Sequence, residues 1–224
     1  MSQKSPLSRI LLATAGFLLV GNASAAVITW TDWTSISGSG ATGIMGGTTV
    51  TAGGVMDGPT SQTGCGTNFW TGTAYTNGDV SNAPTNCEQV SLNSATSITV
   101  TFSSAVNTLY MALLSVGQAG LAVTYDFDQP FSIDSEGLGF FGDDATNGLL
   151  GAGDTLTMRE FHGVLRFAAP VTSLSFTTAP GENWHAFTFG TPAGVVPEPT
   201  SLTLLGLGLG LGLAGLGFRR REKV

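Results

Sequence analysis

The sequence predicts an all-β fold, an antiparallel β-sandwich of jelly-roll-like type, with a targeting segment at each end. Short stretches rich in Val, Thr and Phe alternate with turn signals such as Gly, Asn-Gly and Pro-Gly. No stretch between the ends shows a sustained helical apolar period with caps. Glycine makes up 32 of the 224 residues, and only 10% of the residues are charged. These observations favour short strands joined by tight turns over helices or a charge-rich disordered chain.

Residues 1–25 have the organisation of a secretory signal peptide, which forms a helix until it is removed. Lys4 and Arg9 give a basic start, and Ile10–Val20 is an apolar core too short to cross a bilayer. Ala23 and Ala25 are the small residues that signal peptidase accepts before its cleavage site. We expect cleavage after Ala25; the alternative is an uncleaved N-terminal anchor.

Residues 26–190 are expected to form the sandwich, followed by a linker at 191–196. Eight segments are short, rich in β-branched and aromatic residues, and bounded by turn signals, as strands of a sandwich are. The expected strands are Val27–Trp33, Ser97–Phe102, Asn107–Val116, Ala122–Phe127, Thr155–Phe161, Gly163–Phe167, Thr172–Thr177 and Ala186–Phe189.

One pattern occurs twice in this region. Val100–Met111 (VTFSSAVNTLYM) aligns with Leu165–Phe176 (LRFAAPVTSLSF) at an offset of 65 residues. Both copies consist of a strand ending in Phe, a bend of small residues and a second strand. Two copies are too few for a solenoid, so we expect a strand–bend–strand unit used once in each sheet.

A glycine-rich stretch near the start of the sandwich matches a nucleotide-binding pattern by spacing alone. Gly38–Gly43 fits GxGxxG, but a dinucleotide site needs a helix directly after the glycines. Four further glycines follow within the next eleven residues, and a helix does not tolerate them well. We therefore expect a flexible glycine-rich loop here.

Cys65 and Cys87 are the only cysteines, and in an exported chain such a pair indicates a disulfide. The loop between them is rich in Thr, Asn and Gly, so a covalent link would be needed to order it. The candidates for stacking on sugar rings are Trp30, Trp33, Trp70, Trp184 and Tyr75. Of these, Trp70 and Tyr75, inside this loop, are the ones expected to be exposed. The alternative for these aromatic residues is packing within the sandwich.

The sandwich is strongly acidic, with thirteen Asp and Glu against two Arg, a formal charge of −11. This charge excludes nucleic acid as a partner, because phosphate backbones would be repelled. Several carboxylates fall close together in sequence, and loops between strands can supply the six to eight oxygens that calcium needs. The candidates for a calcium site are Asp126, Asp128, Asp134, Glu136, Asp143 and Asp144. The alternative is a solvated acidic surface.

Signs of catalysis are weak, and we expect a protein that is not an enzyme. His162 and His185 are the only histidines, and no Gly-x-Ser-x-Gly nucleophile motif accompanies them. We expect both to be structural or surface residues. A pair of carboxylates across a groove could hydrolyse a polysaccharide, but sequence does not give their separation.

The C-terminal end has three features in a fixed order. Pro197, Glu198 and Pro199 form an extended Pro-Glu-Pro segment. Residues 201–218 carry no charge and are just long enough for a membrane-spanning helix, although several glycines weaken it. The arginines that follow favour the cytoplasmic side; they are Arg219, Arg220 and Arg221. The alternative is a plain single-pass anchor.

This order of features resembles the PEP-CTERM sorting signal over residues 197–224. The resemblance implies processing by exosortase, a membrane enzyme of Gram-negative bacteria. The helix would then be a transient inner-membrane anchor, and the protein would pass to the cell surface or the extracellular matrix. We expect a structural or interaction role in exopolysaccharide or biofilm. The alternatives are a calcium- or carbohydrate-binding adhesin module and a polysaccharide-acting enzyme.

Overall fold

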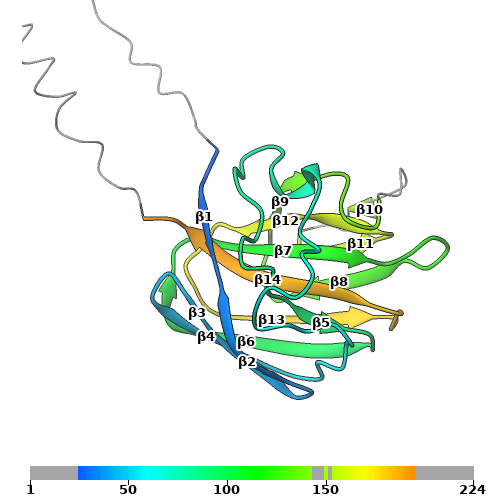
Figure 1. Cartoon of the computed structure of the whole chain (residues 1–224), viewed down its shortest axis with the longest axis horizontal. Coiled ribbons are helices and arrows are strands. Elements are labelled where there is room, and N and C mark those ends of the chain that lie inside the picture. Colours follow the sequence, from blue (N-terminus) through cyan, green and yellow to red (C-terminus); the bar gives the residue numbers. More distant parts are fainter. Residues whose placement is uncertain (1–24, 143–148, 151–152, 195–224) are drawn as a thin grey trace, which may run out of the picture.

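Two antiparallel β-sheets make up the part of the chain that the computed structural model describes, residues 25–142, 149–150 and 153–194 (Figure 1). Every pair of strands in them is antiparallel, and the only helix described is a short 3-10 turn. The predicted all-β antiparallel sandwich is therefore confirmed at this level.

The first sheet has six strands. From edge to edge it runs β1 (Ile28–Trp30), β14 (His185–Pro192), β7 (Leu109–Val116), β12 (Phe161–Phe167) and β9 (Ser132–Glu136), and β5 (Val90–Leu92) also pairs with β14. Thr191 pairs with Thr29 across β14 and β1, so the sheet reaches two residues into the segment expected to be a linker.

The second sheet has eight strands. Its order is β10 (Leu149–Leu150), β11 (Thr155–Met158), β8 (Val123–Phe127), β13 (Val171–Ala179), β6 (Thr96–Val106), β4 (Thr48–Gly53), β3 (Gly40–Met45) and β2 (Asp32–Ser37). The expectation of a flexible loop at Gly38–Gly43 is wrong for Gly40–Gly43, which lie in β3. Only Gly38 and Ser39 form a turn, and β3 and β4 form a regular hairpin. Gly46 and Gly47 make its turn, with φ values of 56° and 87° that glycine adopts without strain.

The inner faces of the two sheets form the main hydrophobic core. Aromatic rings meet across the interface: Phe102 of the larger sheet lies 6.1 Å from Phe189 of the smaller one. Phe176 and Phe187 make a similar edge-on contact at 5.6 Å. Strand β6 alternates buried and exposed residues over most of its length, as expected for a strand with one face on a core.

Strand β7 differs because all eight of its residues are buried. Met111 and Leu113 belong to the core between the sheets. Ala112 and Leu114 point the other way, into a second cluster on the outer face of the six-stranded sheet. Burial on both faces explains why this segment is apolar rather than alternating.

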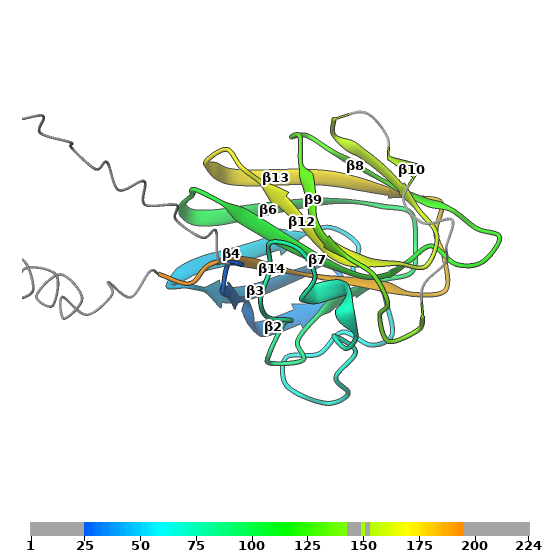
Figure 2. The ribbon, with the colours of Figure 1, turned by 90° about the horizontal axis from the view of Figure 1, so that it is seen from above.

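The loop between β4 and β5 covers that outer face (Figure 2, cyan to teal). It contains the 3-10 helix η1 (Thr73–Tyr75) and the predicted disulfide, in which the Cα atoms of Cys65 and Cys87 are 4.8 Å apart. The expectation that Trp70 and Tyr75 are exposed is wrong, since their exposed fractions are 2% and 0%. Both rings pack on the apolar outer face of the sheet, which would otherwise be open to water.

The repeated pattern is present but is not arranged as expected. The first copy runs from β6 to β7, and the second runs from β12 to β13. Each copy therefore crosses from one sheet to the other, in opposite directions, instead of lying within one sheet. The copies lie side by side, because β6 pairs with β13 and β7 pairs with β12.

The predicted signal peptide and sorting signal cannot be compared with this structure. Residues 1–24 and 195–224 lie outside the described residues, and so do Asp143 and Asp144. Within the described ranges, no helix has the length and apolar character that crossing a membrane requires.

Candidate binding cleft

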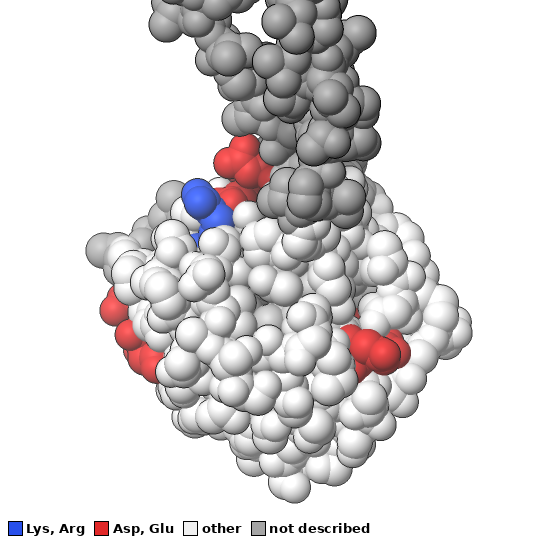
Figure 3. Space-filling view, turned by 90° about the vertical axis from the view of Figure 1, so that its left-hand side faces the viewer, with Lys and Arg blue, Asp and Glu red and all other residues white. Residues whose placement is uncertain are grey.

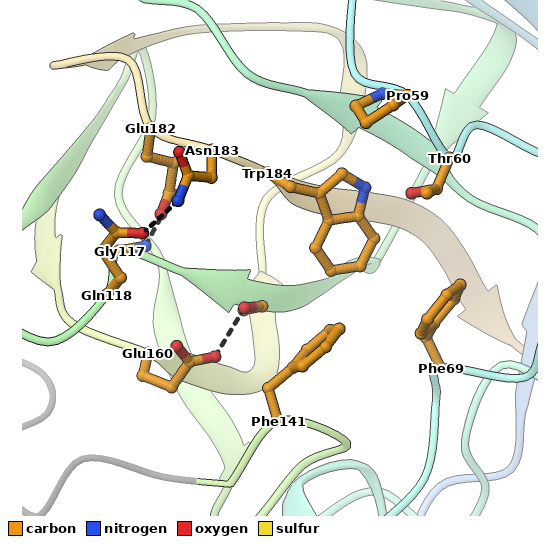
Figure 4. A pocket seen from close by; sticks show the side chains of 11 residues that line it. Pro59, Thr60, Phe69, Gly117, Gln118, Phe141, Glu160, Glu182, Asn183 and Trp184 are labelled. Carbon is orange, nitrogen blue, oxygen red and sulfur yellow. Dashed lines mark hydrogen bonds between the residues drawn. The ribbon is translucent and has the colours of Figure 1, made fainter.

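A cleft opens at the end of the sandwich where β7 ends and β12 and β14 begin (Figure 4). Its volume is about 550 Å³, a size typical of pockets that hold small ligands. Six short stretches of the chain supply its walls, and most of them are far apart in sequence. The lining residues are Pro59, Thr60, Phe69, Ser115, Gly117, Gln118, Phe141, Glu160, Glu182, Asn183 and Trp184. We call this site the aromatic cleft.

Aromatic rings form one side of the cleft, opposite its polar side chains (Figure 4). Phe69 lies 5.3 Å from Trp184 and 6.0 Å from Phe141, measured between ring centroids. Phe140 adds a fourth ring, 5.0 Å from Phe69. Phe140 and Phe141 are 46% and 51% exposed. Large exposed aromatic residues gathered around a hollow are typical of a binding site rather than of a core.

The turn at residues 138–142 carries two of these rings and is fixed by its backbone. Gly139 and Gly142 each donate an N–H to the carbonyl of the other, at 3.1 and 3.2 Å. The N–H of Ala74, in η1, donates to a carbonyl of the turn at 3.1 Å. A Cβ on Gly139 would lie 2.1 Å from the His162 ring, so only glycine fits here. The aromatic rings are thus held on a rigid base.

Two residues of the polar side have strained backbones. Ser115 and Glu160 have φ values of 53° and 48°, a region that residues other than glycine seldom adopt. The Ser115 hydroxyl donates to Glu160 Oε1 at 2.6 Å, which links the two across neighbouring strands. The expected single strand Thr155–Phe161 is interrupted at this point. Backbone strain of this kind costs about 1–2 kcal/mol per residue and clusters at functional sites.

Glu182 is the second carboxylate of the cleft and is only 8% exposed. Its Oε1 accepts a hydrogen bond from the Gly117 N–H at 2.7 Å and lies 2.8 Å from His185 Nδ1. Beside it, the Asn183 side-chain amide donates to Gln118 Oε1 at 3.1 Å. On this side of the cleft, the Gly117 backbone, the His185 imidazole and the Glu182 carboxylate therefore hold one another in place.

A histidine also lies behind Glu160. His162 is 1% exposed, and its Nε2 is 3.4 Å from Glu160 Oε1. Its Nδ1 accepts from the Ser115 N–H at 3.3 Å and lies 3.2 Å from the Tyr75 hydroxyl. Both histidines of the chain are thus buried, as a structural role predicts, but each also contacts a glutamate of the cleft.

Two buried tyrosines lie behind the same wall. Burial raises the pKa of Tyr75 well above its usual range. Burial also raises the pKa of Tyr125, with a further contribution from the negative charge of Glu182. Both phenols therefore stay neutral at ordinary pH, and neither supplies an ionised group to the cleft.

The structure does not gather the predicted calcium residues that it describes. Asp126 lies on β8 and Asp128 directly follows it, both in the larger sheet, whereas Asp134 and Glu136 lie on β9 of the smaller sheet. Asp134 forms a salt bridge with Arg166, whose Nε lies 2.6 Å from the carboxylate. Across the described ranges, no three His, Cys, Asp or Glu residues are grouped so that they could hold a metal ion.

Of the residues that line the cleft, only Trp184 is among the aromatic residues that the sequence indicates as candidates for sugar stacking. Trp70 and Tyr75 are buried, and the ring of this loop that lines the cleft is that of the half-buried Phe69. One usable signal was present: Phe140 and Phe141 stand between glycines in the stretch 137–142. Two consecutive Phe residues in a tight turn have no place in an ordinary strand pattern.

A second hollow, of about 380 Å³, lies at the opposite ends of β7 and β14. We call it the neutral hollow, because its lining has no aromatic or ionisable side chain. It includes Thr29, Thr48, Asn107, Thr108 and Thr191. Figure 3 views the molecule from the side on which β14 ends, where most of the visible surface is uncharged and Asp and Glu form separate small groups.

Comparison of the chain with known protein families, with characterised proteins and with solved structures finds no match to any of them.

Proposed function

We propose that this protein is an exported surface or extracellular-matrix protein that binds a polysaccharide through the aromatic cleft. One observation carries the proposal: three aromatic rings, of Phe69, Phe141 and Trp184, face a row of carboxylate and amide groups across one hollow. Sugars present apolar faces to aromatic rings and hydroxyl groups to polar side chains. This function combines the interaction role expected from the sequence with the carbohydrate-binding alternative.

The route to the surface is proposed from the sequence. The leader would be removed after Ala25 by signal peptidase, and the helix at 201–218 would hold the protein in the inner membrane for a time. The Pro-Glu-Pro segment at 197–199 and the arginines at 219–221 resemble the PEP-CTERM signal, so exosortase is the proposed processing enzyme. Deleting residues 197–224 should then prevent membrane retention and delivery to the surface, as measured by cell fractionation.

Binding can be tested by co-sedimentation of the full-length protein with exopolysaccharide, in a detergent without a sugar headgroup. We expect saturable binding that weakens at least roughly tenfold in Phe141→Ala or Trp184→Ala, because each change removes a stacking surface. Ile44→Ala is the matched control, since Ile44 is an exposed apolar side chain (42%) on β3, outside the cleft. Equal binding by all variants would overturn the proposal.

A polysaccharide-acting enzyme is the second candidate, because Glu160 and Glu182 line the same cleft. Pairs of carboxylates on either side of a glycosidic bond can hydrolyse it, one as acid and the other as base or nucleophile. Incubation of the protein with the same polysaccharide should then create new reducing ends. Loss of that product in Glu182→Gln, with binding retained, would favour the enzyme over the binding module.

Calcium binding stays a separate prediction for the acidic residues of β8, β9 and the segment after β9. The co-sedimentation experiment tests it when repeated with calcium and with EDTA. Binding that EDTA abolishes would assign a role to a metal. Binding that EDTA leaves unchanged would assign the interaction to the aromatic rings.

A further inference from the structure

We propose, as an extension of the polysaccharide-binding function on which it rests, that the aromatic cleft faces away from the membrane that holds the protein. The anchored protein would then bind a polysaccharide chain outside that membrane, before any processing releases it. Its partner would not be the sugar headgroup of a lipid in the same membrane. The positions of the chain ends relative to the cleft carry this inference.

Both ends of the sandwich lie at the same pole of the molecule, beside the neutral hollow (Figure 1). Ile28 of β1 pairs with Pro192 of β14, and the Ala193 N–H donates to the Val27 carbonyl at 2.7 Å. Gly194, the last residue that the structure describes, is part of the lining of the neutral hollow. A membrane tether at either end of the sandwich would therefore hold the molecule by this pole.

The aromatic cleft opens at the opposite pole. Trp184 comes directly before β14, and Gly117 comes directly after β7, which runs antiparallel to β14. Strand β14 has eight residues and so spans about 23 Å. The cleft is thus separated by roughly this length of strand from the point at which the chain leaves the sandwich.

The proposed tether is too short to turn the cleft towards the membrane. Residues 195–200 separate Gly194 from the proposed helix at 201–218, so Gly194 and Ser201 can be at most about 25 Å apart. This reach is close to the length of β14 alone. A cleft that faced the membrane would require a fully extended tether along the whole sandwich, which is costly in conformational entropy.

The exposed side chains of the aromatic turn fit a partner outside the membrane. Leu138 is 58% exposed, and its neighbours Phe140 and Phe141 are also open to solvent. Three exposed apolar residues on one turn could enter a membrane surface as well as bind a glycan. The short tether keeps this turn away from the membrane that anchors the protein, whereas a polysaccharide chain can approach it from the other side.

Energy transfer to the membrane tests the orientation. Ala119→Cys places a thiol next to Gln118 of the cleft, and Ala105→Cys places one in the neutral hollow; both alanines are exposed. The two native cysteines form the disulfide, so the introduced thiol is the one that reacts.

Each full-length variant is reconstituted into vesicles of phosphatidylcholine and phosphatidylglycerol that contain an acceptor-labelled lipid. A donor dye that does not cross the bilayer then labels only the protein that faces outwards. Energy transfer from position 105 should be at least about twofold more efficient than from position 119, because the two sites are separated by roughly the length of β14.

Binding to the anchored protein is measured with the same vesicles. Exopolysaccharide should float with them, with an affinity within about twofold of that measured in a detergent without a sugar headgroup. Trp184→Ala should lose binding in both settings but keep the difference in energy transfer. A flexible insert of about twenty Gly and Ser residues after Gly194 should reduce that difference, because a longer tether lets the sandwich turn over.

Two outcomes would overturn the inference and leave the polysaccharide site intact. Equal energy transfer from the two positions, or stronger transfer from position 119, would bring the cleft to the membrane surface. Binding that is present in detergent but lost in the vesicles would show that membrane attachment blocks the cleft.

Two further outcomes concern the proposals on which the inference rests. Protein that does not stay with the vesicles would reject the membrane anchor, and the orientation with it, but not polysaccharide binding. Absence of binding in detergent would reject the proposed function, and the inference with it, whatever the energy transfer shows.

Discussion

The aromatic cleft and the neutral hollow lie at opposite ends of the same two strands, β7 and β14, yet they share little chemistry. Their volumes are of the same order, about 550 and 380 Å³, but the side chains that line them are chemically different. The cleft has aromatic rings, two carboxylates and two strained residues, Ser115 and Glu160. The neutral hollow is lined by threonines and other uncharged residues. A sandwich leaves hollows at both ends, so the side chains, rather than the fold, indicate which end has a function.

The largest expected effect comes from removing the disulfide, because it closes the part of the loop that carries Phe69. Replacing Cys65 and Cys87 by Ser should lower the free energy of unfolding by about 3 kcal/mol, through the added entropy of the unfolded chain. Glycan binding should fall as well, since Phe69 lies four residues after Cys65. Denaturant unfolding and glycan titration measure the two effects.

Thr48→Ala serves as the comparison for the disulfide variant, because Thr48 lines the neutral hollow and makes only an exposed hydrogen bond to Ser104. It should change neither glycan binding nor stability by more than a few tenths of a kcal/mol. A disulfide variant that still binds glycan with full affinity would show that Phe69 is positioned without the covalent link.

The next prediction compares a glycine at each end of the molecule. Gly139→Ala should displace the aromatic turn, because the new Cβ would lie 2.1 Å from the His162 ring. We expect glycan binding to be lost and the free energy of unfolding to fall by about 1–3 kcal/mol. Gly194→Ala, in the neutral hollow, has nothing within 4 Å of the new Cβ. It should therefore change neither glycan binding nor the free energy of unfolding. Equal effects of the two changes would contradict the assignment.

The backbone strain at the cleft can be measured with paired substitutions. Ser115→Gly and Ser115→Ala both remove the hydroxyl that donates to Glu160, but only glycine relieves the positive φ. The Gly variant should therefore be more stable than the Ala variant by about 1 kcal/mol. At Ser97, in the regularly paired part of β6, the order should reverse, because glycine weakens an ordinary strand. The same order at both positions would show that Ser115 is not strained.

How far the sequence predicts this molecule depends on whether a signal is local. The composition of Ser97–Phe102 and the cysteine pair are local signals, and the strand and the disulfide predicted from them were confirmed. The burial of Trp70 and Tyr75 is not local, because it arises from the apolar outer face of a sheet whose strands come later in the chain. Because the loop is rich in threonine and asparagine, its composition gives no sign that these two rings cover the sheet.

The cleft was missed for a similar reason. Its walls come from six segments between Pro59 and Trp184, and no short motif joins them. Glu160 interrupts what appears in sequence as a continuous strand, and only the pairing of β12 with β7 reveals the irregularity. The Phe pair at 140–141 was the one local sign of an exposed aromatic surface.

The smallest expected effect concerns Glu88, a buried carboxylate that lines neither hollow. Its Oε2 accepts hydrogen bonds from the Trp33 N–H and from the Asn86 side chain, at 2.9 Å for the latter. Burial raises the pKa of Glu88 above its usual value of 4.5, and the nearby Asp32 adds to the rise. The folded protein therefore holds this proton to a higher pH than the unfolded chain does. The contribution of Glu88 to stability should fall as pH rises through that window.

Glu88→Gln removes this titration while keeping an oxygen that can accept the same hydrogen bonds. Relative to the parent protein, the variant should gain stability as the pH rises above about 4.5, and the gain should level off once Glu88 is ionised in both states. Urea unfolding across this range measures the difference, and parallel curves would show that Glu88 does not titrate differently on folding. A confirmed gain would sharpen the contrast with Glu182. Both residues are nearly enclosed, at 4% and 8% exposure, but only Glu182 is among the residues that line a cleft.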